Sequence, residues 1–524
     1  MKNTDNHDNF DVIVIGAGVS GLIAANVLAK RGFKTALVEK NDHVGGCCVN
    51  IKRGEFTFDA GVHFINSAGK EGPLDKILSE FMNFEDIRFI PLKEFVHWID
   101  LKNDIDFVIP MEFNEYVDEL TKFFPDEETG IRDFFIEYEK VVRLLLDMMT
   151  VEKPSQQISF LLKKIKTTMK FLKTTKSSVK QIHEGYINNE VTKETLSYLV
   201  TSLAMFPEDF TALVYLLMEM TIRFAGTYYI KGGGGFLTKK LGDAFLKNKG
   251  HLFLNTEAIS FEIEEKYIKA LKIRDINGES ILNAKEYIIA CDANRFATKL
   301  CPKDSLPEKY KNKILSKKPS NSSITLFLGL DIELKDYGFN EYEIWIYGRH
   351  PNTRENVEKC VSERDFSNMP LEIISIYSNI DKTCCPPGKS VLSITYPSHY
   401  EAWSEYLESN GDRLEDYKKE KERLTNFFID ILSKSLKIDD LKEHIEVVEF
   451  VTPLTIIQTT YNLGGSHLGW ETKVESYMKN RINLKTPFKN GRLAGQWVFP
   501  GGGITSVTMS GYVAARNTIR VLEK

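Results

Sequence analysis

A single βαβ pattern near the N-terminus constrains this chain more than any other feature of its sequence. Residues 10–15 (FDVIVI) form a continuous apolar, β-branched run of the kind that is buried on both faces of a parallel sheet. A helical pattern covers 22–29, and a second strand over 34–38 ends in Glu39. Between the first strand and the helix stand three glycines spaced as G-x-G-x-x-G, at Gly16, Gly18 and Gly21. This order predicts a Rossmann-type dinucleotide-binding unit.

Each residue of this unit has a physical task. Gly16 makes the tight turn, Gly18 lets the backbone approach a pyrophosphate, and Gly21 lets the helix pack closely on the strand. The helix N-terminus supplies unpaired N–H donors for an anion. Glu39 is placed to accept hydrogen bonds from ribose hydroxyls.

The residues after Glu39 favour FAD over NAD. A glycine pair, Gly45 and Gly46, follows after a short loop and opens the sequence Gly-Gly-Cys-Cys, and residues 59–63 read Asp-x-Gly-x-His. These motifs resemble the flavin amine oxidase and phytoene desaturase superfamily, and they are most similar to its retinol saturase and carotenoid isomerase branch. The resemblance implies FAD, and we expect it to be bound non-covalently because the sequence has no specific feature for a covalent flavin link.

A second glycine-rich element lies near the other end of the chain. It runs through 493–496 and 499–503 to Ser510 and Gly511, and an apolar helical pattern follows. In the family that this chain resembles, the segment lies along the ribityl chain and aims a helix N-terminus at the flavin ring. Many relatives carry an acid directly after the Ala-Gly pair, and here the residue is Gln496.

The three flavin motifs divide the chain into two discontinuous domains. The fold class expected is α/β: a Rossmann-type FAD-binding domain with a parallel sheet and helices, plus an α+β substrate domain. We assign the FAD-binding domain to residues 1–69, 226–305 and 486–524, and the substrate domain to 70–225 and 306–485. The cofactor-binding residues expected from the motifs and the resemblance are Gly16, Gly18, Val19, Ser20, Gly21, Glu39, Lys40, Gly45, Gly46, Cys47, Gly61, Val62, Ala258, Gly495, Gln496, Gly503 and Ile504.

Two histidines are the catalytic candidates. His63 follows the glycine pair, and the resemblance places that segment near the flavin ring, where an imidazole would donate or accept a proton. The alternative is a structural histidine. His467 is the second candidate. Cys47 and Cys48 are interpreted as small packing residues and not as redox thiols.

The charge, the cysteine count and the apolar stretches of the sequence limit the kinds of partner expected for this protein. The net charge of −5 provides no basic field for nucleic acid. Seven cysteines, four of them in adjacent pairs, match neither a disulfide framework nor a metal-ligand spacing, so no metal is expected. The most apolar stretch, 211–226, carries Glu219 and Arg223 and is too polar to span a membrane. We expect a cytoplasmic protein, or one held peripherally on the inner face of a membrane.

Two segments of the substrate domain concern the substrate. Residues 195–230 are rich in Leu, Met, Phe and Tyr, which fits either an apolar tunnel or ordinary core. Residues 158–180 carry seven lysines among apolar residues, which fits either a membrane-facing amphipathic helix or a solvated surface. The membrane interpretation would make the helical part, residues 111–225, the membrane-facing region.

The resemblance implies an FAD-dependent oxidoreductase that desaturates, saturates or isomerises carbon–carbon bonds of a lipophilic polyene or isoprenoid such as a carotenoid or retinoid. Such a reaction also needs an external electron donor or acceptor: oxygen, a quinone or a reductase. One alternative is a flavin amine oxidase with an aromatic cage formed by Tyr461 and Trp497. The other is a flavin-bound lipid carrier without catalysis.

Overall fold

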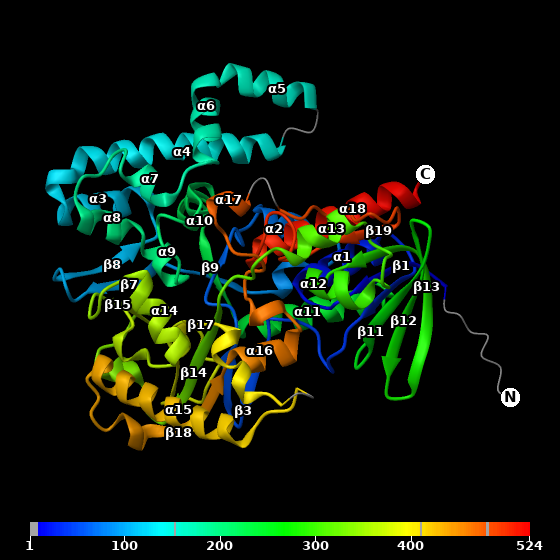
Figure 1. Ribbon diagram of the computed structural model, residues 1–524. Helices are drawn as coiled ribbons and strands as arrows, with labels where there is room; N and C mark the ends of the chain where they lie inside the picture. Colours follow the sequence, from blue (N-terminus) through cyan, green and yellow to red (C-terminus); the bar gives the residue numbers. More distant parts are fainter. Residues whose placement is uncertain (1–8, 151–153, 409–410, 478–480) are drawn as a thin grey trace.

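Two seven-stranded sheets organise the molecule, one at the right of Figure 1 and the other at the left. The computed structural model describes residues 9–150, 154–408, 411–477 and 481–524. The mixed α/β architecture predicted from the sequence is confirmed. The division of the chain at particular domain boundaries stays a prediction.

The first sheet has the strand order β10-β2-β1-β13-β12-β11, with β19 beside β13. Strands β10, β2, β1, β13 and β19 run parallel, whereas β13, β12 and β11 form an antiparallel meander. The continuous apolar run becomes a central strand because both of its faces are covered. The bounds are β1 (Asn9–Ile15), β2 (Thr35–Val38), β10 (His251–Phe253), β11 (Glu257–Glu264), β12 (Tyr267–Asp275), β13 (Gly278–Ile289) and β19 (Gly491–Leu493).

Three helices pack together beside this sheet. α1 (Val19–Lys30) lies between α11 (Gly233–Lys247) and α18 (Ile504–Leu522), so nearly all of its residues are buried. These helices come from the beginning, the middle and the end of the chain (Figure 1). The cofactor motifs at both ends of the sequence therefore meet at α1.

The second sheet has the order β18-β14-β17-β16-β15-β7-β8. Runs of apolar residues in the sequence predict strands over 323–330, 342–347, 371–377 and 391–396. All four strands are present in this sheet, each within two residues of these bounds. The hairpin β7–β8 was not predicted, because the insert around it is dominated by helical patterns. The bounds are β7 (Glu94–Asp100), β8 (Ile105–Pro110), β14 (Ser322–Leu330), β15 (Glu343–Tyr347), β16 (Leu371–Ile376), β17 (Ser390–Ser398) and β18 (Ile445–Val451).

A helical layer covers one end of the second sheet, at the upper left of Figure 1. Its long helix α4 contacts α3, α6 and α10. No helix within the described ranges combines the length and apolarity needed to cross a membrane. The bounds are α3 (Phe113–Phe123), α4 (Glu128–Thr150), α5 (Pro154–Lys163), α6 (Ile165–Thr174), α7 (Val179–His183), α8 (Glu190–Leu196), α9 (Tyr198–Ser202) and α10 (Ala212–Phe224).

The remaining elements include two small sheets. β9 pairs with β5 and β6 in a small sheet, and β3 pairs with β4. The bounds are β3 (Asn50–Arg53), β4 (Phe56–Asp59), β5 (Ile65–Asn66), β6 (Phe89–Pro91), β9 (Thr227–Ile230), α2 (Pro73–Leu78), α12 (Ala293–Arg295), α13 (Glu308–Leu315), α14 (Arg354–Glu363), α15 (Glu415–Leu436), α16 (Pro453–Thr460) and α17 (Val474–Tyr477).

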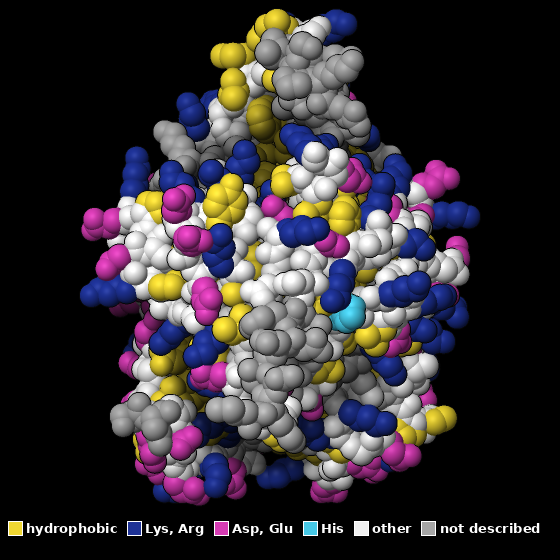
Figure 2. Space-filling view, turned by 90° about the vertical axis from the view of Figure 1, so that its right-hand side faces the viewer, with side chains coloured by type: hydrophobic (Ala, Val, Ile, Leu, Met, Phe, Trp, Pro, Cys, Tyr) yellow, Lys and Arg dark blue, Asp and Glu magenta, His cyan; other side chains and the backbone are white. Residues whose placement is uncertain are grey.

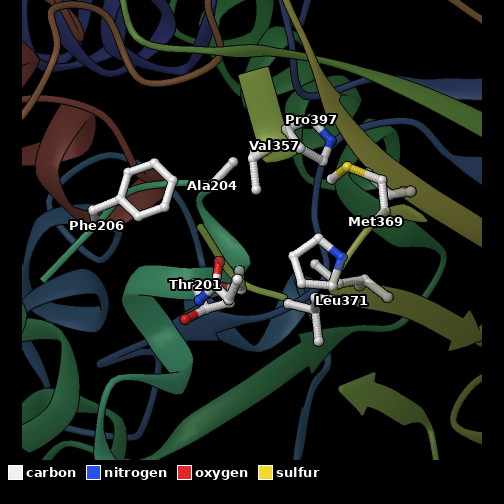
Figure 3. Close-up of a pocket in the computed structure, with 12 residues that line it drawn as sticks. Thr201, Ala204, Phe206, Val357, Met369, Leu371 and Pro397 are labelled. Atoms are coloured by element: carbon white, nitrogen blue, oxygen red, sulfur yellow. The ribbon is translucent and has the colours of Figure 1, made fainter. Parts of the chain in front are cut away.

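The apolar segment 195–230 packs mainly as core. On α10, Leu216 and Met220 are fully buried in the cluster beneath α4. The end of α9 also borders a pocket whose volume of about 20 Å³ holds roughly one water molecule, too little for a long substrate. Figure 3 shows how Thr201, Ala204, Phe206, Val357, Met369 and Leu371 line it.

The same core contains a buried ion pair. The side chains of Glu219 and Arg223, one helical turn apart on α10, are both inaccessible to solvent and 2.7 Å apart. The guanidinium also lies 3.7 Å from the ring centre of Tyr116 and donates to the Tyr198 hydroxyl at 3.3 Å. Because each charge has lost its water, each depends on the other.

We expect the variant Arg223→Met to lose about 3–5 kcal/mol of unfolding free energy, because it leaves the Glu219 charge unpaired in the core. Denaturant titration measures this loss. The double variant Glu219→Leu/Arg223→Met serves as the control and should recover most of the loss. An equal loss in the single and double variants would contradict the expectation.

Candidate cofactor and active site

The first glycine motif forms a turn with almost no free space. Gly16 has φ +99°, a conformation that favours glycine. A β-carbon on Gly16 would lie 2.9 Å from the carbonyl oxygen of Ala290 at the end of β13. A β-carbon on Gly21 would lie 1.9 Å from the carbonyl oxygen of Gly16. The sequence G-x-G-x-x-G is thus required for α1 to approach the sheet.

Gly18, in contrast, faces open space. A β-carbon there would meet no heavy atom within 4 Å, although Gly46 approaches from the other side. α1 begins at the next residue without a side-chain cap on its N–H groups. The buried hydroxyl of Ser20 on the first turn has no hydrogen-bond partner in the described structure. This combination of space, free donors and an unsatisfied hydroxyl fits a bound pyrophosphate.

Glu39 is held at the carboxyl end of β2. Its carboxylate accepts hydrogen bonds from the backbone N–H groups of Ala17, at 2.8 Å, and Asn41, at 3.0 Å. The backbone carbonyl of Glu39 accepts from the N–H of Thr256, two residues before Ala258 on β11. Each carboxylate oxygen can accept a further hydrogen bond, so Glu39 can still receive a ribose hydroxyl. The neighbouring Lys40 instead points to α16, where its ammonium donates to the Gln458 carbonyl at 3.1 Å.

The C-terminal glycine segment lies against the first motif. The N–H of Ala494 donates to the Ile289 carbonyl at the end of β13 and so continues the pairing of β19. Gly495 then donates to the Ser510 hydroxyl at 2.8 Å. Gly503 precedes α18, whose N-terminus also lacks a side-chain cap before Ile504. The second turn of α18 lies against the first turn of α1, where a β-carbon on Gly511 would meet the Ser20 carbonyl at 2.2 Å.

Gln496 lies along a loop of the other domain. Its amide donates to the carbonyl of Ser466 at 3.4 Å, and Asn462 in the same loop donates to the Cys47 sulfur at 3.3 Å. This loop, residues 461–469, closes over the region between the two glycine motifs. The sequence patterns single out Tyr461 and His467 in this loop but do not reveal the contacts of Asn462 and Ser466.

The cysteine pair lies among small residues, with Cys48 buried and Cys47 half-buried. A β-carbon on Gly61 would lie 2.5 Å from the Cys47 carbonyl, and Cys48 donates its thiol hydrogen to the Gly234 carbonyl. Burial raises the pKa of Cys47 to about 11. Both thiols remain protonated at neutral pH, because burial also raises the pKa of Cys48. This environment agrees with a packing role and not with redox chemistry.

The four-glycine segment 232–235 forms the start of α11, with Gly232 as the N-cap and Gly233 as the first helical residue. Gly234 donates to the Asp59 carboxylate at 2.8 Å and Gly235 donates to the Asn50 side chain at 2.9 Å. Asp59 also accepts a hydrogen bond from the N–H of Val62 at 3.2 Å. Because these donors are satisfied within the protein, they do not form a second phosphate site.

His63 reaches from the FAD-side motif to the second sheet. Its Nδ1 lies 2.8 Å from the Glu343 carboxylate on β15 and 2.9 Å from the Ser375 hydroxyl on β16. The Glu343 side chain is only 2% exposed and also accepts from Trp345 Nε1. Burial opposes the charged imidazole, but the Glu343 carboxylate outweighs it, so the pKa of His63 is raised.

The pKa of His467 is shifted in the opposite direction to that of His63. Burial lowers its pKa to about 4, and the charge of His63 acts in the same direction. Its Nε2 lies 2.8 Å from the Ser323 hydroxyl on β14. The two predicted histidines thus bond to different residues of the second sheet but lie near enough for their charges to interact, with His63 favouring the protonated form and His467 the neutral form.

Sequence reasoning missed the partners of these histidines. Glu343 and Ser375 lie about 280 and 310 residues from His63 in sequence, and no local pattern connects them. One signal was available: Glu343 begins the otherwise apolar strand EIWIY, and a buried carboxylate requires a partner.

The aromatic cage that an amine oxidase would need is not formed by Tyr461 and Trp497. Trp497 is buried against Trp470, with ring centres 4.6 Å apart. Tyr461 is partly exposed and contacts two cations, with Lys40 Nζ 4.2 Å and Arg295 Cζ 4.3 Å from its ring centre. The two rings therefore have partners other than a substrate amine.

This arrangement of a parallel sheet, two glycine turns and uncapped helix N-termini defines a dinucleotide-binding oxidoreductase fold. Residues 19–519 match the family described as flavin containing amine oxidoreductase, and the chain belongs to this family. Its cofactor is FAD, and it is an FAD-dependent oxidoreductase. The resemblance to this superfamily inferred from the motifs is confirmed.

Solved structures share the fold. An oxidoreductase from Methanosarcina mazei has a TM-score of 0.58 and 17% identity, covering 98% of this chain and 100% of that one. Putrescine oxidase bound to putrescine has a TM-score of 0.61 and 13% identity, covering 98% and 99% of the two chains.

Three relatives align along most of the chain. All-trans-retinol 13,14-reductase from Danio rerio is 26% identical over 97% of this chain and 87% of its own length. A 4,4'-diapophytoene desaturase from Staphylococcus aureus is 26% identical over 98% and 99% of the two chains. Prolycopene isomerase from Daucus carota is 27% identical over 97% and 79%.

We expect Gly18→Ala to fold normally but to weaken FAD binding at least roughly tenfold, because the new methyl group occupies the space left for the pyrophosphate. Titration of the apoprotein with FAD measures the affinity, and thermal unfolding without FAD checks the fold. Gly185→Ala is the matched control, since its β-carbon would make only ordinary contacts. Unchanged FAD affinity in Gly18→Ala would contradict this placement.

We expect Glu343→Gln to lower the pKa of His63 by removing its charged partner. The interaction stabilises the native protein below the unfolded histidine pKa of about 6.5, and this stabilisation is lost as pH rises through the higher folded value. Histidine NMR titration and thermal midpoints on both sides of that window test this. Glu372→Gln, a buried carboxylate bonded to Ser435, is the control. The same pH profile in wild type and Glu343→Gln would contradict it.

Proposed function

We propose that this protein uses FAD to change carbon–carbon bonds of a lipophilic polyene or isoprenoid, such as a carotenoid or retinoid. The observation that carries the proposal is the full-length similarity to three relatives named for retinol, diapophytoene and prolycopene. Their names cover reduction, desaturation and isomerisation, so the similarity supports the substrate class and leaves the direction to experiment.

The residues around the glycine turns are proposed to hold FAD. Its pyrophosphate would lie over Gly18 and the Ser20 hydroxyl, and its ribose would meet Glu39. The uncapped N-terminus at Gly503 and Ile504 would face the flavin ring. The Gln496 amide would serve the ribityl hydroxyls in place of the acid found in many relatives.

Bound FAD supplies the redox chemistry that no side chain of this site provides. His63 is proposed to hold and transfer a proton at Nε2, because Nδ1 is occupied by Glu343 and Ser375. Its raised pKa suits proton donation during saturation, and the same atom would accept a proton during desaturation. The neutral His467 is proposed to accept or donate a hydrogen bond beside it.

We further propose that oxygen, a quinone or a reductase exchanges electrons with the flavin. We also propose that the protein is cytoplasmic and in peripheral contact with the inner face of a membrane.

The amine oxidase alternative receives less support, because Trp497 is buried against Trp470 and does not form an aromatic cage. The carrier alternative would require a flavin that never cycles.

The test is anaerobic incubation of oxidised and of reduced FAD-loaded protein with carotenoids, retinoids and unsaturated fatty acids in detergent micelles. Chromatography identifies the products, and the flavin spectrum reports its redox state. A changed polyene supports the proposal and reveals the direction. Flavin bleached by simple amines with no change in any polyene would instead assign an amine oxidase.

We expect His63→Gln to retain FAD but to lower kcat by about 10²- to 10⁴-fold, the range typical for loss of a general acid or base. Steady-state kinetics with the active polyene and the flavin absorbance measure the two effects. The half-buried His350, which is not a hydrogen-bond partner of His63 or His467, provides the control His350→Gln. Full activity in His63→Gln would assign this histidine a structural role.

A further inference from the structure

The helices α5 and α6 form a projection from the helical layer, above α4 in Figure 1. α6 contacts α4, and α5 contacts α6. From their surface chemistry we infer that this projection docks the protein on an anionic phospholipid membrane. The purpose of such docking rests on the proposed function, because a lipophilic substrate resides in the bilayer.

Large apolar side chains point into solvent on this projection. The exposed fractions are 64% for Leu162, 51% for Ile165, 62% for Met169 and 50% for Leu172. Ile165, Met169 and Leu172 are spaced by four and three residues, which places them on one face of α6. Figure 2 shows hydrophobic side chains at the projecting top of the molecule.

The opposite side of α6 already anchors it to the protein. Thr168 and Thr174 are buried, and Phe171 packs against the core beneath α4. The outward apolar residues are therefore not needed to hold the helix in place. They form a second apolar face without a partner in the described structure.

The charge of the projection is opposite to that of the whole chain. Residues 154–180 contain seven lysines and no acidic residue, while the chain carries a net charge of −5. Two lysines are paired with acids of α4: Lys164 with Asp147 at 3.1 Å, and Lys170 with Glu137 at 3.2 Å. Among the described residues, the lysines of this segment without an ion pair are Lys163, Lys166, Lys173 and Lys176.

A membrane fits this surface better than a second copy of the chain. A symmetric dimer through α5 and α6 would bring two lysine-rich segments together, with like charges facing each other. Anionic headgroups instead neutralise the lysines, while the apolar face enters the acyl boundary. Both features of the surface are then satisfied by one partner.

The experiment is flotation of the FAD-loaded protein with phosphatidylcholine vesicles, with and without phosphatidylglycerol. We expect binding to the mixed vesicles that weakens as salt rises. Lys163→Glu/Lys166→Glu/Lys173→Glu should weaken binding by roughly 100-fold, since each lysine near an anionic surface contributes roughly a factor of five. Ile165→Glu/Met169→Glu should weaken it by at least roughly tenfold.

Matched controls keep the charge change and move it elsewhere. Lys247→Glu/Lys303→Glu/Lys335→Glu alters three exposed lysines remote in sequence, and Leu246→Glu/Ile276→Glu alters two exposed apolar residues. Both controls should bind vesicles as the wild type does, and thermal midpoints confirm folding of every variant. Equal loss in variants and controls, or no binding by the wild type, would overturn the inference.

Two further outcomes are separable. A dimer that forms without lipid and is broken by Ile165→Glu/Met169→Glu would assign the surface to a second copy and overturn membrane docking. Turnover of polyenes in detergent micelles is measured independently of vesicles. Vesicle binding without any polyene turnover would therefore reject the proposed function and leave the docking inference standing.

Discussion

The site depends on one close approach: the Gly16 carbonyl oxygen occupies the space that a β-carbon on Gly21 would fill, at 1.9 Å. This approach presses α1 onto the turn after β1, so its first N–H groups point over Gly18. Gly511 of α18 is restricted to glycine for the same reason, because a β-carbon there would lie 2.2 Å from the Ser20 carbonyl. Backbone contact between α1 and α18 thus fixes the direction of α18 relative to the first turn of α1.

The two sheets contribute different kinds of chemistry to this site. The first sheet presents backbone donors and small residues, which suit a phosphate and a ribose. The second presents a buried carboxylate, Glu343, which holds the His63 imidazole between the two domains. His63 and His467 differ in pKa direction because only His63 has a charged acceptor. The asymmetry arises from the second sheet and not from the flavin motifs.

Local patterns predicted much of the first domain, since strand, glycine turn and helix follow one another within about 30 residues. They also located most strands of the second sheet. They did not predict β7–β8, whose short alternating segments stand within a helical insert. They also missed Glu343, Ser375 and Ser323, because these partners reach the histidines only through tertiary contacts. Residues that reach a histidine only through the tertiary fold have no fixed spacing from it in the sequence.

The packing of α18 against α1 has a consequence during protein synthesis. Gly495 and Ser510 lie beside the first glycine motif, so the nascent chain lacks half of its cofactor pocket until these residues leave the ribosome. Helix α1 must then wait for α18, whose contact residue Gly511 lies nearly 500 residues later, at a cost in loop-closure entropy. Flavin uptake by this protein would thus mark a translated and folded polypeptide. The yellow of bound flavin would therefore report that α18 has been synthesised and has packed on α1.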